Sequence, residues 1–402
     1  MDSAFVAIDL GASSTRCISN SSQLLTVPNN MCMLDMDTVV DQEVIGDSIL
    51  DNLEVYITKE DNKCRIKRYT GEVTEILPAH VVIGQMAERY SSVQTTPDAN
   101  MAKRFQPINY ISILTGVALT KLKDSLDDQI ELYLAIPPSQ LTKEAREAMS
   151  EALVGKYKVE FAKFAGGQVV EFTITEVNLE AESSLAVMSY LFNTKLAYRP
   201  ENRKYAGENK ILLSMDIGAS TTDLVIVKGG VFMENTGKTI KVGGNLVRDK
   251  LADKLTSRFD DEPVSKQLAE DALIEGRVKR GSLTLDASKE VNESKQEVAD
   301  IIINEMTNYF IEKGYPISAI DAIVVSGGGS IASQYVNKDG EIVPASKPMS
   351  EIISDKLTKL SPGTVVESHG SNPRTANIEG LYIKVAAIHK KRERDKAKAN
   401  AN

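Results

Sequence analysis

The sequence contains few of the residues that usually carry metal or thiol chemistry. Its 402 residues include three cysteines, three histidines and no tryptophan. None of these cysteines and histidines stands in a CxxC or HExxH spacing, which argues against zinc and thiol chemistry. A sparse, odd set of cysteines is also typical of a reducing compartment.

The chain also lacks long apolar runs and an excess of positive charge. No stretch of about 18 apolar residues could span a bilayer, and MDSAFVAIDL at the start has no basic region of the kind that begins a signal peptide. Lys and Arg number 47 against 56 Asp and Glu, and the net charge is −9. Because phosphate backbones are bound by clustered Lys and Arg, direct nucleic-acid binding is not expected. We expect a cytoplasmic protein without a membrane partner.

The length predicts two domains, since 402 residues are many for one core. Residues 29–100 show short strand-like pieces between polar turns, which we interpret as an inserted, mobile subdomain. The charged tail KKRERDKAKANAN is expected to be a frayed, solvated end. Apolar spacing predicts strands near residues 5–8, 159–164, 169–175, 211–215 and 224–227, and helices near 109–126, 142–153, 246–259 and 298–310.

One short pattern occurs twice, half a chain apart. FVAIDLGASSTRC spans residues 5–17 and LLSMDIGASTTDL spans residues 212–224. Each copy follows an apolar run and is predicted to form a strand, a glycine-containing turn and a second strand. Either turn alone is more often a plain surface hairpin, but the pair, each led by Asp, favours a shared function.

Turns built from small residues can bind phosphate. They allow successive backbone N–H groups to point into one concavity, which bulky side chains would block. Ser13, Ser14 and Thr15 would supply these donors in the first turn, with charge added by Arg16. The residues predicted to hold a polyphosphate are Gly11, Ala12, Ser13, Ser14, Thr15 and Arg16 in the first turn, and Gly218, Ala219, Ser220, Thr221, Thr222 and Asp223 in the second.

Asp9 and Asp216 end the strands that lead into these turns. A carboxylate beside phosphates would repel them unless a cation lay between. Mg²⁺, which keeps most of its waters, can be held by carboxylates through those waters. We therefore predict a Mg²⁺-bound nucleoside triphosphate, ATP or GTP, with Asp9 and Asp216 holding the metal through water.

Two further glycine turns are candidates for nucleotide contact. VVSGGGSIAS matches neither the GxGxxG fingerprint nor the Walker A loop. Alone it would be an ordinary turn, but after two phosphate hairpins it is interpreted as a floor for adenosine, formed by Gly327, Gly328, Gly329 and Ser330. Gly243 and Gly244 would let backbone approach the nucleotide, although a turn that begins a helix explains them equally well.

These motifs together resemble the actin, heat-shock chaperone and sugar-kinase ATPase superfamily. Its phosphate 1, connect 1, phosphate 2 and adenosine motifs are similar to residues 9–16, 181–188, 216–223 and 326–330, in that order. Within it, DLGASSTR, AESSLA and IVVSGGG look most like the bacterial plasmid-segregation actins, the ParM and Alp group. EGRVKRGSL, which includes Lys279, is similar to the adenine-contacting helix of the chaperones, although Gly276 departs from that pattern.

The resemblance implies an α/β fold: a two-lobed actin and ribonuclease-H-like ATPase with duplicated domains around a nucleotide cleft. Domain I would comprise residues 1–205 and 376–402, with an inserted subdomain at about 29–100. Domain II would comprise residues 206–375, with an inserted helical subdomain at about 255–290. Catalysis would involve Glu182, Asp9 and Asp216. Glu182 would position the attacking water, with Glu180 as the alternative. Asp223 would orient the second turn or serve only structure.

The function implied is a filament-forming ATPase or GTPase that moves plasmid DNA through a DNA-bound, ParR-like adaptor. GASS also resembles the first loop of acetate kinases, so a small-molecule kinase of the acetate or sugar type is an alternative, as is another bacterial actin such as a cell-shape protein. A chaperone is disfavoured because the residues after 380 are too few for a peptide-binding domain. A membrane-bound cell-shape actin is disfavoured because no amphipathic N-terminal helix is evident.

Overall fold

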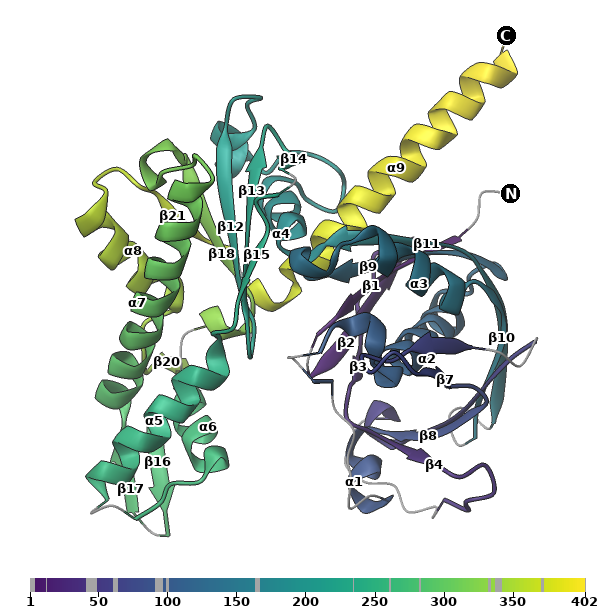
Figure 1. Ribbon diagram of the computed structural model, residues 1–402, viewed down its shortest axis with the longest axis horizontal. Coiled ribbons are helices and arrows are strands. Elements are labelled where there is room, and N and C mark those ends of the chain that lie inside the picture. Colours follow the sequence, from purple (N-terminus) through teal and green to yellow (C-terminus); the bar gives the residue numbers. More distant parts are fainter. Residues whose placement is uncertain are drawn as a thin grey trace. The chain divides into compact units, whose positions relative to one another are not determined.

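The chain folds into two compact units. The first comprises Met1–Leu185, Thr194–Leu196 and Asn377–Asn402, and the second comprises Ala186–Asn193 and Ala197–Ala376. The predicted domain boundaries at residues 205 and 375 stay a prediction. The computed structural model (Figure 1) describes residues 4–11, 13–40, 49–60, 64–90, 97–98, 101–162, 167–233, 235–259, 262–281, 283–331, 334–336, 342–369 and 372–401.

The first unit is built on a nine-stranded sheet in the order β3-β2-β1-β9-β11-β10-β5-β8-β4. β1 is buried along its whole length, and it pairs in parallel with β9, which pairs in parallel with β11. Strands buried on both faces read as continuous apolar runs, as FVAI does here. The strands are β1 Ala4–Leu10, β2 Ser14–Ser19, β3 Leu25–Pro28, β4 Met31–Leu34, β5 Leu53–Lys59, β8 Ala79–Ile83, β9 Gln129–Ile136, β10 Gly155–Phe161 and β11 Gln168–Ala181.

Helices pack against this sheet and close its core. α2 begins with Pro107, whose fixed φ suits a first helical position, and its buried side chains pack with those of the sheet. β6 (Arg65–Lys67) and β7 (Val73–Glu75) form a separate small hairpin. The helices are α1 Ala87–Tyr90, α2 Pro107–Asp124, α3 Lys143–Leu153, α4 Glu182–Leu191, which continues into the second unit, and α9 Ala376–Ala401.

The second unit is built on a six-stranded sheet, with β15 paired to β13 beside the path β14-β13-β12-β18-β21. Its core lies between this sheet and the long apolar faces of α7 and α8. The strands are β12 Ile211–Ile217, β13 Thr222–Lys228, β14 Val231–Phe232, β15 Lys238–Ile240, β18 Ala322–Ser326 and β21 Val366–Ser368, with small hairpins β16 Arg277–Arg280 with β17 Leu283–Asp286 and β19 Gln334–Val336 with β20 Ile342–Pro344. The helices are α5 Gly244–Arg258, α6 Lys266–Glu275, α7 Ser288–Glu312 and α8 Met349–Leu360.

The two sheets repeat one topology. The run β3-β2-β1-β9-β11 in the first unit corresponds, strand by strand, to β14-β13-β12-β18-β21 in the second. In each run an antiparallel hairpin is followed by two parallel pairings. The repeated sequence motif therefore lies on a repeated fold.

The irregular segment 29–100 contributes regular structure. β5, β8 and β4 extend the nine-stranded sheet by antiparallel pairing. Short strand-like pieces were expected in this segment, and β5, β6 and β8 are such strands. The interpretation of this region as an inserted subdomain stays a prediction.

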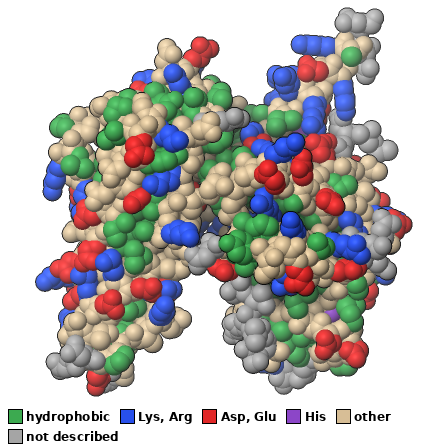
Figure 2. All heavy atoms as spheres, in the orientation of Figure 1, with side chains coloured by type: hydrophobic (Ala, Val, Ile, Leu, Met, Phe, Trp, Pro, Cys, Tyr) green, Lys and Arg blue, Asp and Glu red, His purple; other side chains and the backbone are tan. Residues whose placement is uncertain are grey.

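The C-terminal tail is helical, so the expectation of a frayed end is wrong for the described residues. α9 continues to Ala401, and its first half packs through buried Leu381, Ile383 and Val385. Lys, Arg, Glu and Ala are good helix formers, and the packed first half supplies the nucleus. Lys and Arg side chains cover the exposed second half (Figure 2), where Arg392 Nη1 lies 2.7 Å from Glu131 Oε2. No helix in the described part of the chain is long and apolar enough to span a membrane.

Candidate functional site

The first repeated motif forms a tight hairpin at the end of β1. The Gly11 amide donates to the Ser14 carbonyl at 3.0 Å, closing the turn. Ser13 is exposed at the tip, whereas Thr15 is buried and paired on both sides, opposite Leu10 and Val27. Ala12 lies outside the described residues. Among the described residues, Ser13 therefore lies at the tip of this turn, whereas β2 begins at Ser14 and Thr15 lies within the sheet.

The second motif repeats this geometry at the end of β12. The Gly218 amide donates to the Thr221 carbonyl at 2.8 Å. Ala219 is exposed at the tip, Ser220 follows it, and Thr222 is buried. The repeated sequence therefore gives two hairpins closed by the same hydrogen bond at the same position.

The hairpins differ in the charge that faces their leading Asp. Asp9 stands opposite Arg16, and Arg16 Nη1 donates to Asp9 Oδ2 at 3.2 Å. In the same register Asp216 stands opposite Asp223, and both carboxylates are at least nine-tenths buried. Asp223 accepts from Thr239 Oγ1 at 2.5 Å. The first hairpin thus pairs an acid with a base, whereas the second sets two acids side by side.

Each hairpin is held by a hydrogen bond from the buried threonine that follows its tip. Thr15 Oγ1 donates to Asn29 Oδ1 at 2.7 Å, and Thr222 Oγ1 donates to the Val242 carbonyl at 2.7 Å. Asn29 Nδ2 also donates to the Gly11 carbonyl at 2.6 Å, and Ser112 of α2 donates to Asn29 Oδ1. Asn29 was not predicted from the sequence, because nothing in the local pattern distinguishes it from a polar loop residue.

Gly244 begins α5 and Gly243 is its N-cap, so these glycines form a turn that begins a helix, as the alternative interpretation held. The amides of Gly244 and Asn245 donate to the carbonyls of Gly218 and Ala219, at 3.0 and 2.6 Å. A Cβ on Gly243 would lie 2.6 Å from the Gly218 oxygen, so only glycine allows this approach. The second hairpin therefore supplies acceptors for the otherwise unpaired first amides of α5.

The three-glycine turn packs directly on the end of β12. Gly327 has a φ of +88°, which favours glycine, and a Cβ there would lie 2.3 Å from Asp216 Oδ1. A Cβ on Gly329 would lie 2.9 Å from the Gly218 oxygen. Ser330 is buried and donates to the Gly327 carbonyl. Within the second unit, the second hairpin, the start of α5 and the three-glycine turn thus lie side by side.

Two cations, Arg374 and Lys295, flank this glycine turn, and neither was predicted from a local sequence pattern. Exposed Arg374 places Nε 3.7 Å from the position a Cβ on Gly328 would take. Lys295 of α7 is buried and donates to the Ile331 carbonyl, Ser346 Oγ and the Lys347 carbonyl, at 3.2, 2.8 and 3.2 Å. Burial lowers the pKa of Lys295 to about 8. Lys295 thereby ties the residue after the turn to the segment leading into α8.

Lys279 does not lie on a helix, so the expected helix over EGRVKRGSL is wrong. α6 ends at Glu275, where Gly276 adopts a left-handed φ of +66°. Arg277–Arg280 is strand β16 and pairs with β17 across a turn at Gly281. Left-handed glycine ends helices, and Val278 packs into a small separate core. Lys279 pairs with Glu275 at 2.8 Å.

Glu182 and Glu180 lie in different elements. β11 extends through residues 178–181, because these residues pair with β9. Glu180 is thus a strand residue, and its carboxylate accepts from Lys384 of α9. Glu182 begins α4, is 7% exposed, and accepts from Lys103 Nζ. Lys103, like Asn29, was not predicted from the sequence.

Two known families match the sequence. Residues 7–183 match the actin-like proteins N-terminal domain, and residues 214–335 match the C-terminal domain of the archaeal actin homologue MreB-like family. The chain belongs to the actin-like proteins. A search of curated proteins gave no match to this actin-like protein.

Solved structures share the fold of this actin-like protein at low identity. The actin-like protein Alp7A is 16% identical, with 98% of this chain and 99% of that chain covered and a TM-score of 0.69. An archaeal actin homologue is 16% identical, covering 96% and 99%, with a TM-score of 0.68. A 15-stranded ParM filament from Clostridium botulinum is 16% identical, covering 97% and 100%, with a TM-score of 0.62. The predicted α/β actin-like fold is confirmed.

The carboxylates of this actin-like protein fit a hydrated magnesium ion. Asp216 and Asp223 present two neighbouring acids, and Mg²⁺ is usually bound by one or two carboxylates while it keeps several waters. Asp9 is already paired with Arg16. The donor set therefore suits the metal better at the second hairpin than at the first.

Proposed function

We propose that this actin-like protein binds ATP or GTP with Mg²⁺ through both hairpin turns, hydrolyses it, and assembles into filaments under its control. The observation that carries the proposal is the matched pair of hairpins, each closed by one amide-to-carbonyl bond from Gly11 or Gly218. A nucleotide with several phosphates is the ligand that two such turns would hold together.

Each element has a role in this proposal. Ser13 and Ser14 of the first turn and Ala219 and Ser220 of the second offer backbone amides to the phosphates. Arg16 adds positive charge on the first side. The turn Gly327–Gly329 contacts adenosine. Asp216 and Asp223 of the second turn would hold Mg²⁺ through water, with Asp9 of the first turn as a further carboxylate. The metal, when bound, would neutralise phosphate charge.

Glu182 orients the water that attacks the terminal phosphate. Reactions of this class rest on positioning and on spreading charge rather than on a covalent intermediate. A carboxylate at the first position of a helix, nine-tenths buried, is held in a fixed place, as that role requires.

Solved relatives agree with nucleotide binding and assembly. Among them are an archaeal actin homologue in complex with ADP, a Bacillus thuringiensis ParM with ATP, and the Clostridium botulinum filament. Head-to-tail contacts that do not close a ring produce filaments. We further propose that the filament acts in the cytoplasm and moves plasmid DNA through a DNA-bound adaptor similar to ParR, since a chain of net charge −9 is a poor direct ligand for DNA.

The proposal is tested by light scattering and pelleting of the purified chain with ATP, GTP or ADP, with Mg²⁺ or with a chelator. We expect polymer with a triphosphate and Mg²⁺, and loss of polymer in Ser13→Glu, which sets a negative charge at the first tip. Thr70→Glu adds the same charge at the exposed turn between β6 and β7 and should assemble normally. Absence of polymer at any accessible concentration contradicts the proposal, and phosphate transfer to a metabolite would favour a kinase.

Glu182→Ala tests the hydrolytic role separately. This variant should still assemble, but its polymer should disassemble slowly because phosphate release fails. Phosphate release at the normal rate would move the role elsewhere, first to Glu180.

A further inference from the structure

We infer that Lys103 is the positioning residue for Glu182, and this inference rests on the proposed function. The residues come from distant parts of the chain, separated by 79 positions, and meet within the first unit. Lys103 Nζ donates to Glu182 Oε1, and the two side chains are only 16% and 9% exposed. In such a partly dry position a cation in direct contact with a carboxylate restrains its orientation more strongly than a solvent-exposed ion pair would.

The backbone of Lys103 is fixed independently of this ion pair. Its amide donates to Gln140 Oε1 at 2.8 Å, and its carbonyl accepts from buried Asn109 Nδ2 at 3.0 Å. The next residue is also held, since Tyr110 OH donates to the Arg104 carbonyl at 2.9 Å. The ammonium group therefore starts from an anchored segment, the short helix η3 (Lys103–Phe105), unlike that of a flexible surface lysine.

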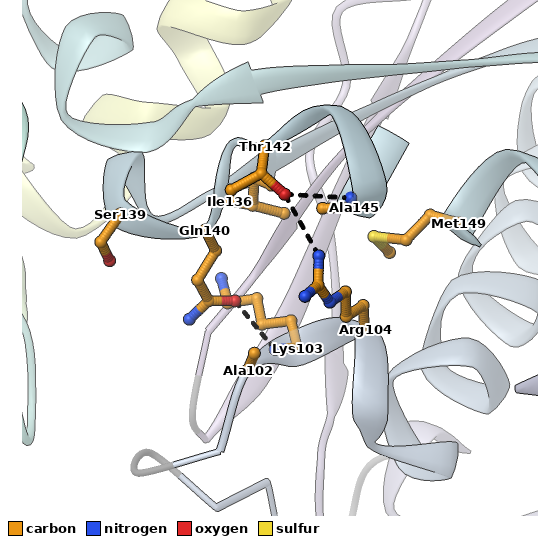
Figure 3. Close-up of a pocket in the computed structure, with 9 residues that line it drawn as sticks. All are labelled: Ala102, Lys103, Arg104, Ile136, Ser139, Gln140, Thr142, Ala145 and Met149. Atoms are coloured by element: carbon orange, nitrogen blue, oxygen red, sulfur yellow. Dashed lines mark hydrogen bonds between the residues drawn. The ribbon is translucent and has the colours of Figure 1, made fainter. Parts of the chain in front are cut away.

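Figure 3 shows Lys103, Arg104, Gln140 and Thr142 beside a cavity of about 110 Å³ that they help to line. Gln140 reaches the Lys103 amide from η4 (Pro138–Gln140), which follows β9, and Arg104 donates to Thr142 Oγ1 at the start of α3. β9 is the direct neighbour of β11, the strand that delivers Glu182. One oxygen of the Glu182 carboxylate is thus connected to the sheet by hydrogen bonds through Lys103 and Gln140.

This geometry gives Lys103 a defined task. By binding Oε1, it selects one rotamer of Glu182 and one orientation of the carboxylate plane. Misplacing a group that orients a reacting water by about 1 Å costs about a hundredfold in rate. Lys103 would therefore affect the chemical step through Glu182, while leaving the affinity for nucleotide nearly unchanged.

The inference is tested by measuring phosphate release and nucleotide affinity in four variants. They are Lys103→Met, Lys103→Arg, Glu182→Gln and the double variant that combines Lys103→Met with Glu182→Gln. We expect Lys103→Met to lower kcat by about 10- to 100-fold with KM changed less than about twofold. Lys103→Arg should restore most of the rate. The double variant should match Glu182→Gln, because Lys103 has no target once the carboxylate is gone. Lys121→Met is the matched control, since Lys121 pairs with Asp128 elsewhere in the same unit.

The outcomes separate the inference from the proposed function. A natural chain that releases no phosphate from any nucleotide overturns both. If the natural chain is active, two results overturn only the role of Lys103. In one, Lys103→Met keeps the natural kcat; in the other, its KM rises by as large a factor as its kcat falls. Lys103→Met alone leaves Glu182 without its cation and could unfold, whereas the double variant leaves no such charge. In that case the double variant is compared with Glu182→Gln. A lower rate in the double variant than in Glu182→Gln overturns the inference.

Discussion

At the scale of single residues, His369 links pH to the stability of the second unit. Its side chain is 4% exposed. Ser189 Oγ donates to the Ala376 carbonyl, so it accepts from His369 Nε2, 2.7 Å away. His369 Nδ1 then carries no proton, and it has no hydrogen-bond partner among the described residues. Burial, together with the nearby charge of Arg199, lowers the pKa of His369 to about 4.

We predict that this histidine makes the fold sensitive to acid. The native pKa of about 4 is lower than the ordinary value of 6.5, so the contribution of His369 is fully present above pH 6.5 and is lost as pH falls from 6.5 to 4. The loss amounts to roughly 3 kcal/mol. Urea unfolding between pH 7.5 and 4.5 should show it, and His369→Asn should flatten that part of the pH profile. An unchanged slope in the variant would contradict the assignment.

The repeated motif allowed Asp9 and Asp216 to be chosen from sequence, because a hairpin is local and both copies carry the same pattern. Asn29 and Lys103 could not be chosen in this way. The partners of Asn29 include Ser112, 83 positions away, and the partner of Lys103 lies 79 positions away. Such pairs form only when folding brings distant loops and helices together, and no single stretch of sequence encodes them.

At the scale of elements, the contact between the second hairpin and the start of α5 depends on one glycine. A Cβ on Gly243 would lie 2.6 Å from the Gly218 oxygen and 2.8 Å from the Ala219 oxygen, whereas a Cβ on the neighbouring Gly244 would meet nothing nearer than 3.6 Å. The crowding atoms at Gly243 are backbone and cannot rotate away. The two adjacent glycines therefore form a matched pair for mutation.

We predict that Gly243→Ala destabilises the chain by about 1–3 kcal/mol, because the hairpin and helix must move apart. Gly244→Ala should change stability by less than about 0.5 kcal/mol. Thermal unfolding of both variants, with and without nucleotide, provides the measurement. Equal stability of the two variants would show that the backbone approach at Gly243 is not tight.

The helices and strands themselves were largely predictable, because apolar residues recur at a clear helical or strand spacing in most long segments. The helix near 109–126 corresponds to α2, and the strand near 211–215 lies in β12. The errors fall where local signals compete. Gly276 ends α6 within a charged stretch, and Arg277–Arg280 after it form strand β16. The polar tail is helical because it continues α9, whose first half is packed.

At the scale of the whole molecule, the net charge of −9 opposes self-association, because copies repel one another. We predict that raising KCl from about 50 to 300 mM lowers the critical concentration for assembly by about two- to fivefold, since the screening length is only about 10 Å at 0.1 M. Pelleting at each salt concentration measures it, with nucleotide affinity measured in parallel as a control. A critical concentration that rises with salt would show that the contacts pair opposite charges.

The duplicated topology also bears on the history of the chain. Fusion of two copies of one ancestral gene would produce two sheets with the same strand order and the same hydrogen bond closing each hairpin. Before that fusion, a symmetric pair of subunits would have offered a ligand two identical turns. Arg16 and Asp223, which occupy the same register position in the two copies, then mark where the halves diverged into a cationic and an anionic side.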